Sequence, residues 1–591
     1  MNLSKSKIFF YFRNLKQAIT RRGRAFPVPA QDDIDKKLVY SLSPRKIPSG
    51  RQFRHLPKFL KPKEYLAVKI CLLLIIVNLV YLGIIFINRH LEYFPKAGGT
   101  YTEGLVGYPK TINPLYATNR DVDADLSRLI YSSLFVYDAD GRLANDLADS
   151  YSIGAEGKEY TVKLKDNVFW HNGDRLTADD VIFTFELIKN PAYRSPLVPE
   201  LTNINAEKID DETIKFSLGQ AYGPFLELLT FGILPKNLWQ NISPEAAALN
   251  ALNLKPVGSG PYKFVSLIKD SAGDLKEYHL TVNLTYYGAK PYLTNIIFKF
   301  FPSYPEAIKA FNDNQLDGLG YLPFELRSSL LAQNSLFLHE LVRPQIVAVF
   351  FNQNKNKSLA DKAVRVGLAE ALNKDQLIKE AFAGVYVSAD GPLPSSSFAY
   401  NDALTKYSYD PGAAVDTFKN KPLSLALTVI DSGSNVAVAQ AIKTYWEDSG
   451  VKVDLKIIPS DQAASIIKNR DFEVLFYGET VGGDPDIYAF WHSTQTGANG
   501  LNLAGYANSE ADKLLTTGRL SADLDERLAA YKKLQEIITT DLPAIFLYSP
   551  TYTYVQTKEV QGFSGTVAVS PADRFAGVSF WYIKTYKKLA W

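Results

Sequence analysis

The sequence predicts an α/β protein of several structural units, preceded by one transmembrane helix. The chain has 591 residues, too many for one hydrophobic core, since a domain usually takes about 100–200 residues. Strand-like and helix-like patterns alternate along the chain without a regular repeat, and one apolar run is long enough to cross a membrane. Hydrophobic residues make up 46% and charged residues 21%, a composition typical of folded chains.

The apolar run extends from Leu66 to Ile87 and contains two strongly polar residues, Lys69 and Asn78. Its uninterrupted part begins at Ile70, and as a helix this part would span about 27 Å of the roughly 30 Å hydrocarbon core. Lys69 can extend toward the headgroups. Asn78 lies mid-span, where a protein partner would relieve the cost of placing an amide in lipid.

More basic residues precede this run than follow it, which by the positive-inside rule places the N-terminus in the cytoplasm and the large body outside. We interpret residues 65–88 as an uncleaved signal anchor, followed by a linker at residues 89–97. A cleavable signal fits poorly because the run starts far from the N-terminus and no A-x-A site follows it. Lys69 is also wrong for lipid attachment at Cys71, and a buried helix of a soluble core is the alternative. The expected location is the plasma membrane, single-pass, with the body in a periplasm or cell-wall space.

Residues 1–64 carry 16 lysines and arginines against four acidic residues, a net charge of +12, while the rest of the chain carries 49 basic and 58 acidic residues. A basic segment beside an acidic body suggests nucleic-acid binding. The adjoining anchor instead favours a topology signal that is attracted to the anionic lipid bilayer. We predict a basic, largely disordered cytoplasmic segment with a short amphipathic helix at residues 4–20, and no nucleic-acid partner.

The spacing of apolar residues predicts the elements of the body. A strand is expected at Tyr101–Gly107, and two more at Tyr160–Lys165 and Thr213–Leu218, where apolar and polar residues alternate. A helix is expected at Asp121–Leu134, because its leucines and isoleucine fall on one side. Another helix should begin after Thr177, a good N-cap residue with an aspartate three positions later.

Motifs for catalysis and metal binding are incomplete. One cysteine and six scattered histidines exclude a disulfide scaffold, a cysteine-ligated zinc and a histidine cage. His339-Glu340 lacks the second histidine of the H-E-x-x-H motif, and Gly562–Gly565 is one residue short of a nucleophile elbow. We therefore predict that the protein is not an enzyme and that it uses no metal and no cofactor.

Nine short blocks in the body carry a family resemblance. They are Trp170–Val181 (WHNGDRLTADDV), Ile233–Trp239 (ILPKNLW), Pro256–Tyr262 (PVGSGPY), Tyr286–Tyr292 (YYGAKPY), Phe351-Asn352, Ala360–Asn373, Tyr409–Pro411 (YDP), Gly483–Asp486 (GDPD) and Asp541–Pro543 (DLP). Through these blocks, over residues 98–591, the body resembles the family 5 extracellular solute-binding proteins, the peptide, nickel and oligosaccharide receptors of ABC importers. One block alone would be weak, whereas nine in the family's order are specific.

The resemblance implies a two-lobed, periplasmic-binding-protein-like clamp with a subdomain inserted in lobe I. By analogy, lobe I comprises residues 98–137, 218–301 and 546–591, the inserted subdomain residues 138–217, and lobe II residues 302–545. Prolines that interrupt strand-like runs support hinges near Phe301-Pro302 and near Leu547–Pro550.

The implied function is that of a membrane-anchored substrate-binding component of an ABC importer. Lobe closure would capture a short peptide outside the membrane, and the closed clamp would deliver it to the ABC permease and ATPase subunits. A monomer is expected. The same clamp binding nickel chelate, haem or oligosaccharide, or acting as a tethered ligand sensor, is the alternative.

Candidate ligand contacts lie in three segments that the resemblance places at the cleft. In peptide-binding relatives an aspartate that pairs with the ligand amine sits three residues before the Asp-Pro aspartate, and here Val481 takes that place. Glu479 is the possible substitute, so Glu479→Gln should weaken any cationic ligand. The predicted ligand-binding residues are Thr111, Ile112, Asn113, Phe351, Asn352, Tyr477, Gly478, Glu479 and Thr480.

Other residues of the blocks have structural interpretations. Gly258 and Gly260 should supply backbone angles that other residues resist. His171 is expected to be a satisfied turn residue and not a metal ligand. Asp484 and Asp486 should cap a helix that begins at Ile487.

Overall fold

The computed structural model describes residues 60–330 and 335–589 of the chain. The described residues form two compact units, one that ends at Glu92 and includes the last residues from Lys588, and one that comprises Tyr93–Lys587. Residues 1–59 of the predicted disordered segment, including the helix at residues 4–20, lie outside the described residues, whereas the last three residues of that segment begin a helix.

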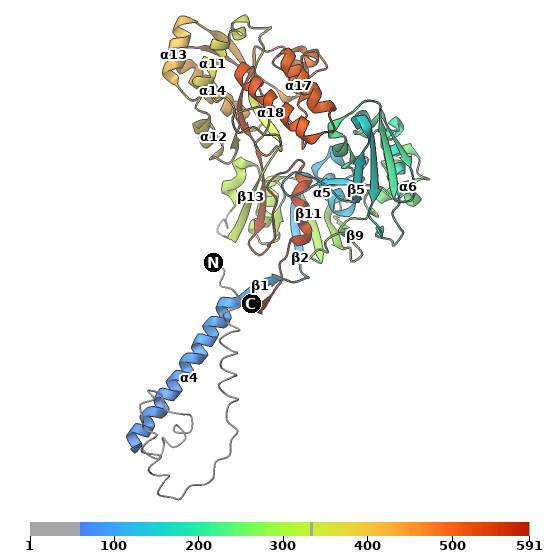
Figure 1. Cartoon of the computed structure of the whole chain (residues 1–591), viewed down its shortest axis with the longest axis vertical. Helices are drawn as coiled ribbons and strands as arrows, with labels where there is room; N and C mark the ends of the chain where they lie inside the picture. Colours follow the sequence, from blue (N-terminus) through green and yellow to red (C-terminus); the bar gives the residue numbers. More distant parts are fainter. Residues whose placement is uncertain (1–59, 331–334, 590–591) are drawn as a thin grey trace, which may run out of the picture. The chain divides into compact units, whose positions relative to one another are not determined.

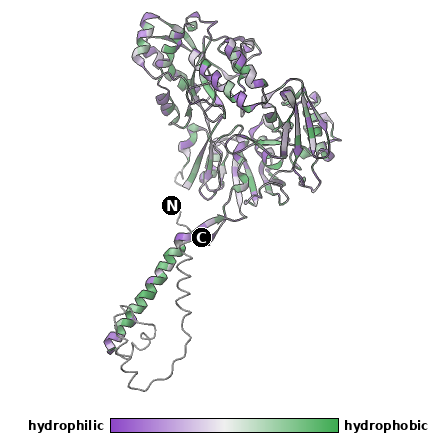
Figure 2. Cartoon of the chain, viewed as in Figure 1, coloured by the Kyte–Doolittle hydropathy of each residue, from purple (hydrophilic) through white to green (hydrophobic). Residues whose placement is uncertain are grey.

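The first unit contains one long helix, α4 (Pro62–His90). Residues Pro62–Ile87 are long and apolar enough to cross a membrane, with a mean hydropathy of 3.0, and Figure 2 shows their apolar character along the helix. The amide of Asn78 donates to the carbonyl oxygen of Leu74 at 2.9 Å. The helix itself therefore supplies a partner for this polar side chain, so the expected relief by another protein is not required.

A seven-stranded sheet is the base of the second unit, with the strand order β13-β20-β12-β2-β11-β10-β9. β2 runs parallel to β11 and β12, and the other neighbours are antiparallel. The strands are β2 (Thr100–Val106), β9 (Tyr262–Lys269), β10 (Leu275–Val282), β11 (Asn295–Phe301), β12 (Gly318–Leu319), β13 (Leu336–Val342) and β20 (Thr551–Thr557).

Helices cover both faces of this sheet. α5 (Asp121–Ile130) contributes leucines and isoleucine to the larger core, and α10 (Tyr304–Asn312) packs in a separate small core with β12. Two strands at the boundary of the two units, β1 (Leu91–Pro95) and β21 (Thr585–Leu589), pair as a two-stranded ribbon.

A four-stranded antiparallel sheet, β5-β6-β8-β7, forms the inserted subdomain (Figure 1). It shares its core with the seven-stranded sheet, and we call the two together lobe I. Its elements are β3 (Phe135–Tyr137), β4 (Leu143–Asn145), β5 (Ala148–Ile153), β6 (Glu159–Leu164), α6 (Ala178–Lys189), α7 (Val198–Leu201), β7 (Ile204–Lys208) and β8 (Thr213–Leu218), followed by α8 (Lys236–Trp239) and α9 (Pro244–Ala247).

A six-stranded mixed sheet, β15-β19-β14-β18-β16-β17, forms lobe II. Two hydrophobic cores lie on the two faces of this sheet. α11–α14 pack in one core and α16–α18 in the other (Figure 1). The strands are β14 (Gln345–Phe351), β15 (Val387–Ser388), β16 (Ser424–Ile430), β17 (Lys452–Ile458), β18 (Val474–Thr480) and β19 (Ala544–Ser549). The helices are α11 (Lys362–Glu370), α12 (Lys374–Phe382), α13 (Pro411–Asn420), α14 (Asn435–Asp448), α15 (Ala463–Asn469), α16 (Tyr488–Trp491), α17 (Ser509–Leu520) and α18 (Leu524–Asp541).

The chain crosses between the lobes at two adjacent places. It leaves the first sheet after Val342 and enters the second at Gln345, and it returns through Pro550 between β19 and β20. The two crossings are tied by a hydrogen bond from the amide of Arg343 to the carbonyl oxygen of Pro550, 3.0 Å long.

The crossing predicted at Phe301-Pro302 is wrong, because residues 302–342 supply α10, β12 and β13 to lobe I. The return predicted near Leu547–Pro550 coincides with the observed one, although β19 belongs to the sheet of lobe II.

The glycine turn at Pro256–Tyr262 decides where α5 ends. The helix was expected to continue to Leu134, but it stops at Ile130, whose carbonyl oxygen accepts from the amide of Gly260 at 2.8 Å. A Cβ atom at Gly258 would lie 1.9 Å from that carbonyl oxygen, and one at Gly260 would lie 2.6 Å from the carbonyl oxygen of Leu129. Close backbone approach, and not an unusual φ, therefore requires these glycines.

His171 holds the same turn. Its Nδ1 accepts from the amide of Gly258 at 3.2 Å, and its Nε2 lies 3.1 Å from the carbonyl oxygen of Gly260. Burial lowers the pKa of His171 to about 4, because the charged ring would lose its hydration. The prediction of a satisfied turn histidine is confirmed.

Candidate functional site

The two lobes contact each other through a small set of polar and aromatic residues, which we call the seam. Glu227, in the 3-10 helix Gly223–Leu229 of lobe I, accepts with Oε2 from the backbone amide of Asp484 in lobe II at 2.9 Å. The ring of Tyr137 lies against Gly483, where an added Cβ would be 2.4 Å from Cε1 of the ring. A glycine is therefore needed for the lobes to approach this closely.

An ion pair on the lobe II side fixes the position of Asp484. Nη2 of Arg527 donates to both carboxylate oxygens of Asp484, at 2.5 and 2.6 Å, and both side chains are buried. Asp486 pairs with Arg519, whose Nε donates to Oδ2 of the carboxylate at 2.9 Å. The expected helix caps are therefore only partly right: Asp486 accepts from the first amide of α16 at 3.3 Å, whereas Asp484 serves the ion pair.

The carboxyl group of Glu227 at the seam has a raised pKa. Burial, and next the charge of Asp484, raise the pKa of Glu227 to about 7, although a hydrogen bond with Tyr137 acts in the opposite direction. Burial also raises the pKa of Asp484, against the effect of Arg527. Closing the seam thus brings two carboxyl groups from opposite lobes close together.

A cavity of about 210 Å³ opens in lobe I beside the seam, and Tyr137 contributes to both. Its other lining residues come from α5 and the segments just before and after it, from residues 230–232 and from residues 570–573. A second cavity of about 90 Å³ adjoins it and shares Arg128, Tyr131 and Val136. Since a water molecule occupies about 30 Å³, the larger cavity has room for several waters or for one side chain of a ligand.

Hydrogen-bonding groups without a partner belong to residues that line these cavities. Among the residues that the structure describes, the buried atoms Nε of Arg128, Oη of Tyr131 and Oγ of Ser132 make no hydrogen bond. Such groups are rarely left unsatisfied in a folded protein. Their gathering in one place favours a site that receives oxygen-bearing groups, from water or from a ligand.

One aspartate lies beside the guanidinium of Arg128, and the charge of the arginine acts on a second. Nε of Arg128 lies 3.9 Å from Oδ1 of Asp573. Burial raises the pKa of Asp146, and the charge of Arg128 opposes that rise. Asp573 accepts from the amide and hydroxyl of Ser570, at 2.7 and 3.0 Å. Arg128 also donates through Nη2 to the carbonyl oxygen of Tyr137 at 3.1 Å, which links the cavity to the seam.

The first predicted segment, Thr111, Ile112 and Asn113, belongs to the interior of lobe I. Ile112 and Asn113 have no exposed surface. Asn113 donates to Oδ1 of Asn253 at 3.0 Å and accepts from the amide of Leu115 at 2.9 Å. Its side chain is committed to the loop, and only Thr111 keeps some exposure.

The second predicted pair, Phe351 and Asn352, lies at the end of β14. Phe351 is fully buried in a core of lobe II. The side-chain amide of Asn352 donates through Nδ2 to the carbonyl oxygen of Phe472 at 3.0 Å. These contacts maintain the fold, so ligand contact by either residue stays a prediction that would require them to move.

The third segment, Tyr477, Gly478, Glu479 and Thr480, is a strand and not a loop, because all four residues belong to β18. The flexible glycines follow it, with Gly482 at φ 91°. Glu479 is 7% exposed, and burial raises its pKa well above the usual range, opposed by the charge of Arg470. Within the described ranges its Oε1 makes no hydrogen bond.

Neither Glu227 nor the cavity residues were singled out from the sequence. Glu227 stands in an apolar stretch, FLELL, whereas Arg128 lies on the side of the expected helix opposite its apolar residues. A charged residue in an apolar pattern was the one available signal, and it does not reveal the partner across the lobes.

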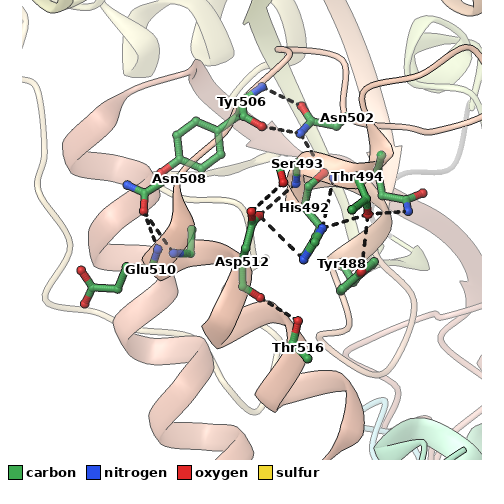
Figure 3. A network of polar contacts seen from close by, with 12 residues as sticks. Tyr488, His492, Ser493, Thr494, Asn502, Tyr506, Asn508, Glu510, Asp512 and Thr516 are labelled. Carbon is green, nitrogen blue, oxygen red and sulfur yellow. Dashed lines mark hydrogen bonds and ion pairs between the residues drawn. The ribbon is translucent and has the colours of Figure 1, made fainter.

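A serine, a histidine and an aspartate meet in lobe II (Figure 3). The hydroxyl of Ser493 donates to Asp512 at 2.6 Å, while Nδ1 of His492 lies 2.9 Å from the hydroxyl of Thr494. The histidine therefore does not accept the serine proton, as a catalytic base would. The network ties the turn after α16 to α17.

Comparisons with known proteins agree on one family. The model of the bacterial extracellular solute-binding proteins, family 5, matches residues 142–501. The chain is 26% identical over 495 residues to the oligopeptide-binding protein AppA of Bacillus subtilis, covering 79% of this chain and 89% of the relative. It is 26% identical over 491 residues to the dipeptide-binding protein of Escherichia coli, covering 77% of this chain and 90% of the relative.

Solved structures show the same fold. The ABC transporter substrate-binding protein CtaP of Listeria monocytogenes matches with a TM-score of 0.71 and 26% identity, over 82% of this chain and 99% of that one. AppA of Bacillus subtilis in complex with a nonapeptide matches with a TM-score of 0.61 and 25% identity, over 83% of this chain and 100% of that one. These neighbours are two-lobed, as is the arrangement of sheets described above.

Proposed function

The chain belongs to the family 5 bacterial extracellular solute-binding proteins, and from this membership we propose that it captures short peptides and delivers them to the permease and ATPase of an ABC importer. Proteins of this family bind solutes for transport and are not enzymes. The observation that carries the peptide assignment is that the two relatives above, each similar over most of its length, are oligopeptide- and dipeptide-binding proteins.

The ligand site in this proposal is the seam together with the adjoining cavity of lobe I. A peptide offers carbonyl oxygens at every residue, which suit the unpartnered donors of Arg128, Tyr131 and Ser132. Tyr477 and Thr480 complete the site from the partly exposed end of β18. Closure of lobe II over lobe I would remove these contacts from water and strengthen them.

The chemistry of the described residues favours a peptide over a metal as the ligand. Within the described part of the chain no group of three or more histidine, cysteine, aspartate or glutamate side chains is arranged to hold a metal ion. A nickel chelate would have to bring its own ligands to this site, whereas a peptide needs only hydrogen-bond partners.

α4 serves in this proposal as a single-pass anchor with its N-terminus in the cytoplasm, so that the clamp stays at the outer surface of the membrane. Its length and apolar character support this role, and the basic residues before it support the orientation. Alkaline carbonate should leave the full chain in the membrane pellet. Recovery of the intact chain in the soluble fraction would contradict the anchor.

Mass spectrometry of small molecules retained through native purification tests the ligand. We expect short peptides to be released on denaturation of the wild-type chain, and much less from Arg128→Gln. Arg175→Gln is the matched control, because Arg175 forms a surface ion pair with Glu212 away from the cavity. Recovery of a sugar, haem or nickel chelate would contradict the peptide assignment, and steady conversion of the bound compound would contradict binding without chemistry.

A further inference from the structure

The seam contains three carboxyl groups and two arginines, and both arginines belong to lobe II. Asp484 and Asp486 pair with Arg527 and Arg519, all four in lobe II. Glu227 approaches from lobe I, and in the described part of the chain no lysine or arginine forms an ion pair with it. Contact between the lobes therefore places Glu227 beside an acid whose charge is already matched.

The surroundings of Glu227 come from both lobes. Oε2 accepts from the amide of Asp484 at 2.9 Å, and Tyr137 of β3 shares a hydrogen bond with the same carboxyl group. The charged groups that act on Glu227 are Asp484, from the segment after β18, and Arg527, from α18. Tyr222 precedes the helix of Glu227, and the charges of Asp486 and Glu227 both act on its hydroxyl. The ring of Tyr222 lies 5.9 Å from the guanidinium of Arg519.

Separation of the lobes would remove the part of this environment that lobe II supplies. The contacts from Asp484 and Gly483 cross the seam, whereas Tyr137 stays with Glu227 in lobe I. With lobe II withdrawn, water would solvate the carboxylate and the nearby acid would be gone. The charged form is therefore easier to keep in the open state than in the closed one.

We propose that closure of the two lobes takes up one proton, bound by the carboxyl group of Glu227 at the seam, so that acidity favours the closed clamp. This inference rests on the proposed function only in requiring that the lobes open and close. A protonated Glu227 keeps one oxygen that can accept from the amide of Asp484, so the hydrogen bond across the seam survives protonation.

The raised pKa of Glu227, about 7 with the lobes in contact at the seam, agrees with this inference. A carboxyl group in water has a pKa of about 4.5, so the closed state binds the proton more tightly. Closure is then favoured as the pH falls through about 7, and the advantage is complete below about 4.5. By linkage, the ratio of closed to open molecules should rise roughly 10- to 30-fold between pH 8 and pH 5.5.

The experiment measures the distance between the lobes by pulsed electron spin resonance, on the full chain in detergent and without added ligand. The single cysteine, Cys71 in α4, is replaced by serine, and spin labels are attached at Glu186→Cys in lobe I and Lys419→Cys in lobe II. Their native side chains are 56% and 70% exposed. The closed fraction is read from pH 8 to pH 5.5.

The expected result is a closed fraction that rises as the pH falls in the wild-type background. Glu227→Gln, a neutral side chain of the same shape, should be closed to a similar extent at every pH. The matched control Glu207→Gln, on an exposed edge of β7, should keep the wild-type profile.

A flat wild-type profile would overturn the inference, and so would a Glu227→Gln profile as steep as the wild type. Because no ligand is added, failure of the protein to bind peptides would contradict the proposed function and leave this result standing.

Discussion

Two sites in the molecule combine buried carboxyl groups with one buried arginine, and they use it differently. In the core of lobe I, Arg574 bonds both Glu103 and Asp125, with contacts between 2.6 and 3.0 Å. At the seam, Arg527 bonds only Asp484, and Glu227 meets that pair from the other lobe. In the first arrangement one arginine serves two carboxyl groups of the same lobe, whereas at the seam the second carboxyl group comes from the other lobe and leaves the arginine when the lobes separate.

The charged cluster of lobe I, formed by Glu103, Asp125 and Arg574, lies within one lobe and stays buried whether or not the lobes separate. Glu103 of β2 and Arg574 are 471 positions apart and have no exposed side-chain surface. Glu103 also accepts from the hydroxyls of Tyr101 and Tyr554, at 2.9 and 2.8 Å. Because its carboxylate oxygens are well provided with donors, the cost of burying it is offset where a lone buried charge would not be.

Removal of the arginine from the lobe I cluster should have the largest effect. Arg574→Leu would leave two buried carboxylates without a cation, and we expect the free energy of unfolding of the body to fall by about 3–5 kcal/mol. Urea denaturation followed by fluorescence measures this. Arg175→Leu is the control, since its exposed ion pair with Glu212 should contribute less than about 1 kcal/mol. Equal effects of the two variants would contradict the assigned role of the cluster.

The same substitution at the seam should have a smaller effect on folding and a larger one on closure. Arg527→Leu strands Asp484, but opening of the lobes can return that carboxylate to water, so we expect a loss of about 1–3 kcal/mol. The closed fraction in the spin-label experiment should fall at neutral pH. A loss as large as that of Arg574→Leu, with closure unchanged, would show that both arginines act within a fixed core.

The sequence predicts those parts of the molecule that local patterns determine. The capping pair Thr177 and Asp180 starts α6 where expected, at Ala178, and the alternating strand Thr213–Leu218 is β8. The glycine turn was recognised as a fixed feature, but for the wrong reason. The reason is the clash that a Cβ atom at position 258 would make with the backbone of Ile130. These two segments are far apart in sequence, and one sequence does not reveal their contact.

The site was harder to predict than the fold for the same reason. Glu227 and the Asp484 amide are 257 positions apart, and each lies in a stretch with an ordinary structural interpretation. Glu479 was predicted as a substitute for the aspartate that peptide-binding relatives carry where this chain has Val481. Antiparallel pairing with β14, in which Glu479 lies opposite Ile346, makes the stretch around Glu479 a strand, and the carboxyl group is buried.

Glu479 provides a third case, a buried acid with still fewer partners. Its raised pKa means that its contribution to stability is fully present below the unfolded pKa of about 4.5 and is lost as the pH rises toward the folded value. Glu479→Gln removes the charge, so we expect it to stabilise the body by about 1 kcal/mol at pH 8 and by less at pH 5. Urea denaturation at both pH values measures this difference.

The same variant also tests the ligand contact predicted for Glu479. If its carboxylate contacts a ligand ammonium, Glu479→Gln should weaken the binding of a cationic peptide. A loss of stability at pH 8 in this variant would contradict the expected cost of burying the charge. Glu510→Gln, on the exposed first turn of α17, is the control for both measurements.

Tyr137→Phe should have the smallest effect on stability and the most specific effect on the seam. The hydroxyl of Tyr137 lowers the pKa of Glu227 through its hydrogen bond, so its removal should raise that pKa and move the midpoint of closure to higher pH. The loss in unfolding free energy should stay below about 1.5 kcal/mol, since one hydrogen bond is removed. Tyr131→Phe is the matched control, because it lines the same cavity and, within the described ranges, its buried hydroxyl makes no hydrogen bond.

Only the Tyr137 variant should move the midpoint of the pH profile read by the spin labels. A midpoint that moves to lower pH, or one that Tyr131→Phe moves equally, would mean that the seam responds to the cavity as a whole and not to the proton on Glu227. The lobe I cluster should be unaffected by either variant, because its carboxylates draw their donors from Arg574, Tyr101 and Tyr554. The lobe I cluster and the seam would then differ in one property. The charge balance of the seam depends on the other lobe, as closure of a clamp requires, and that of the lobe I cluster does not.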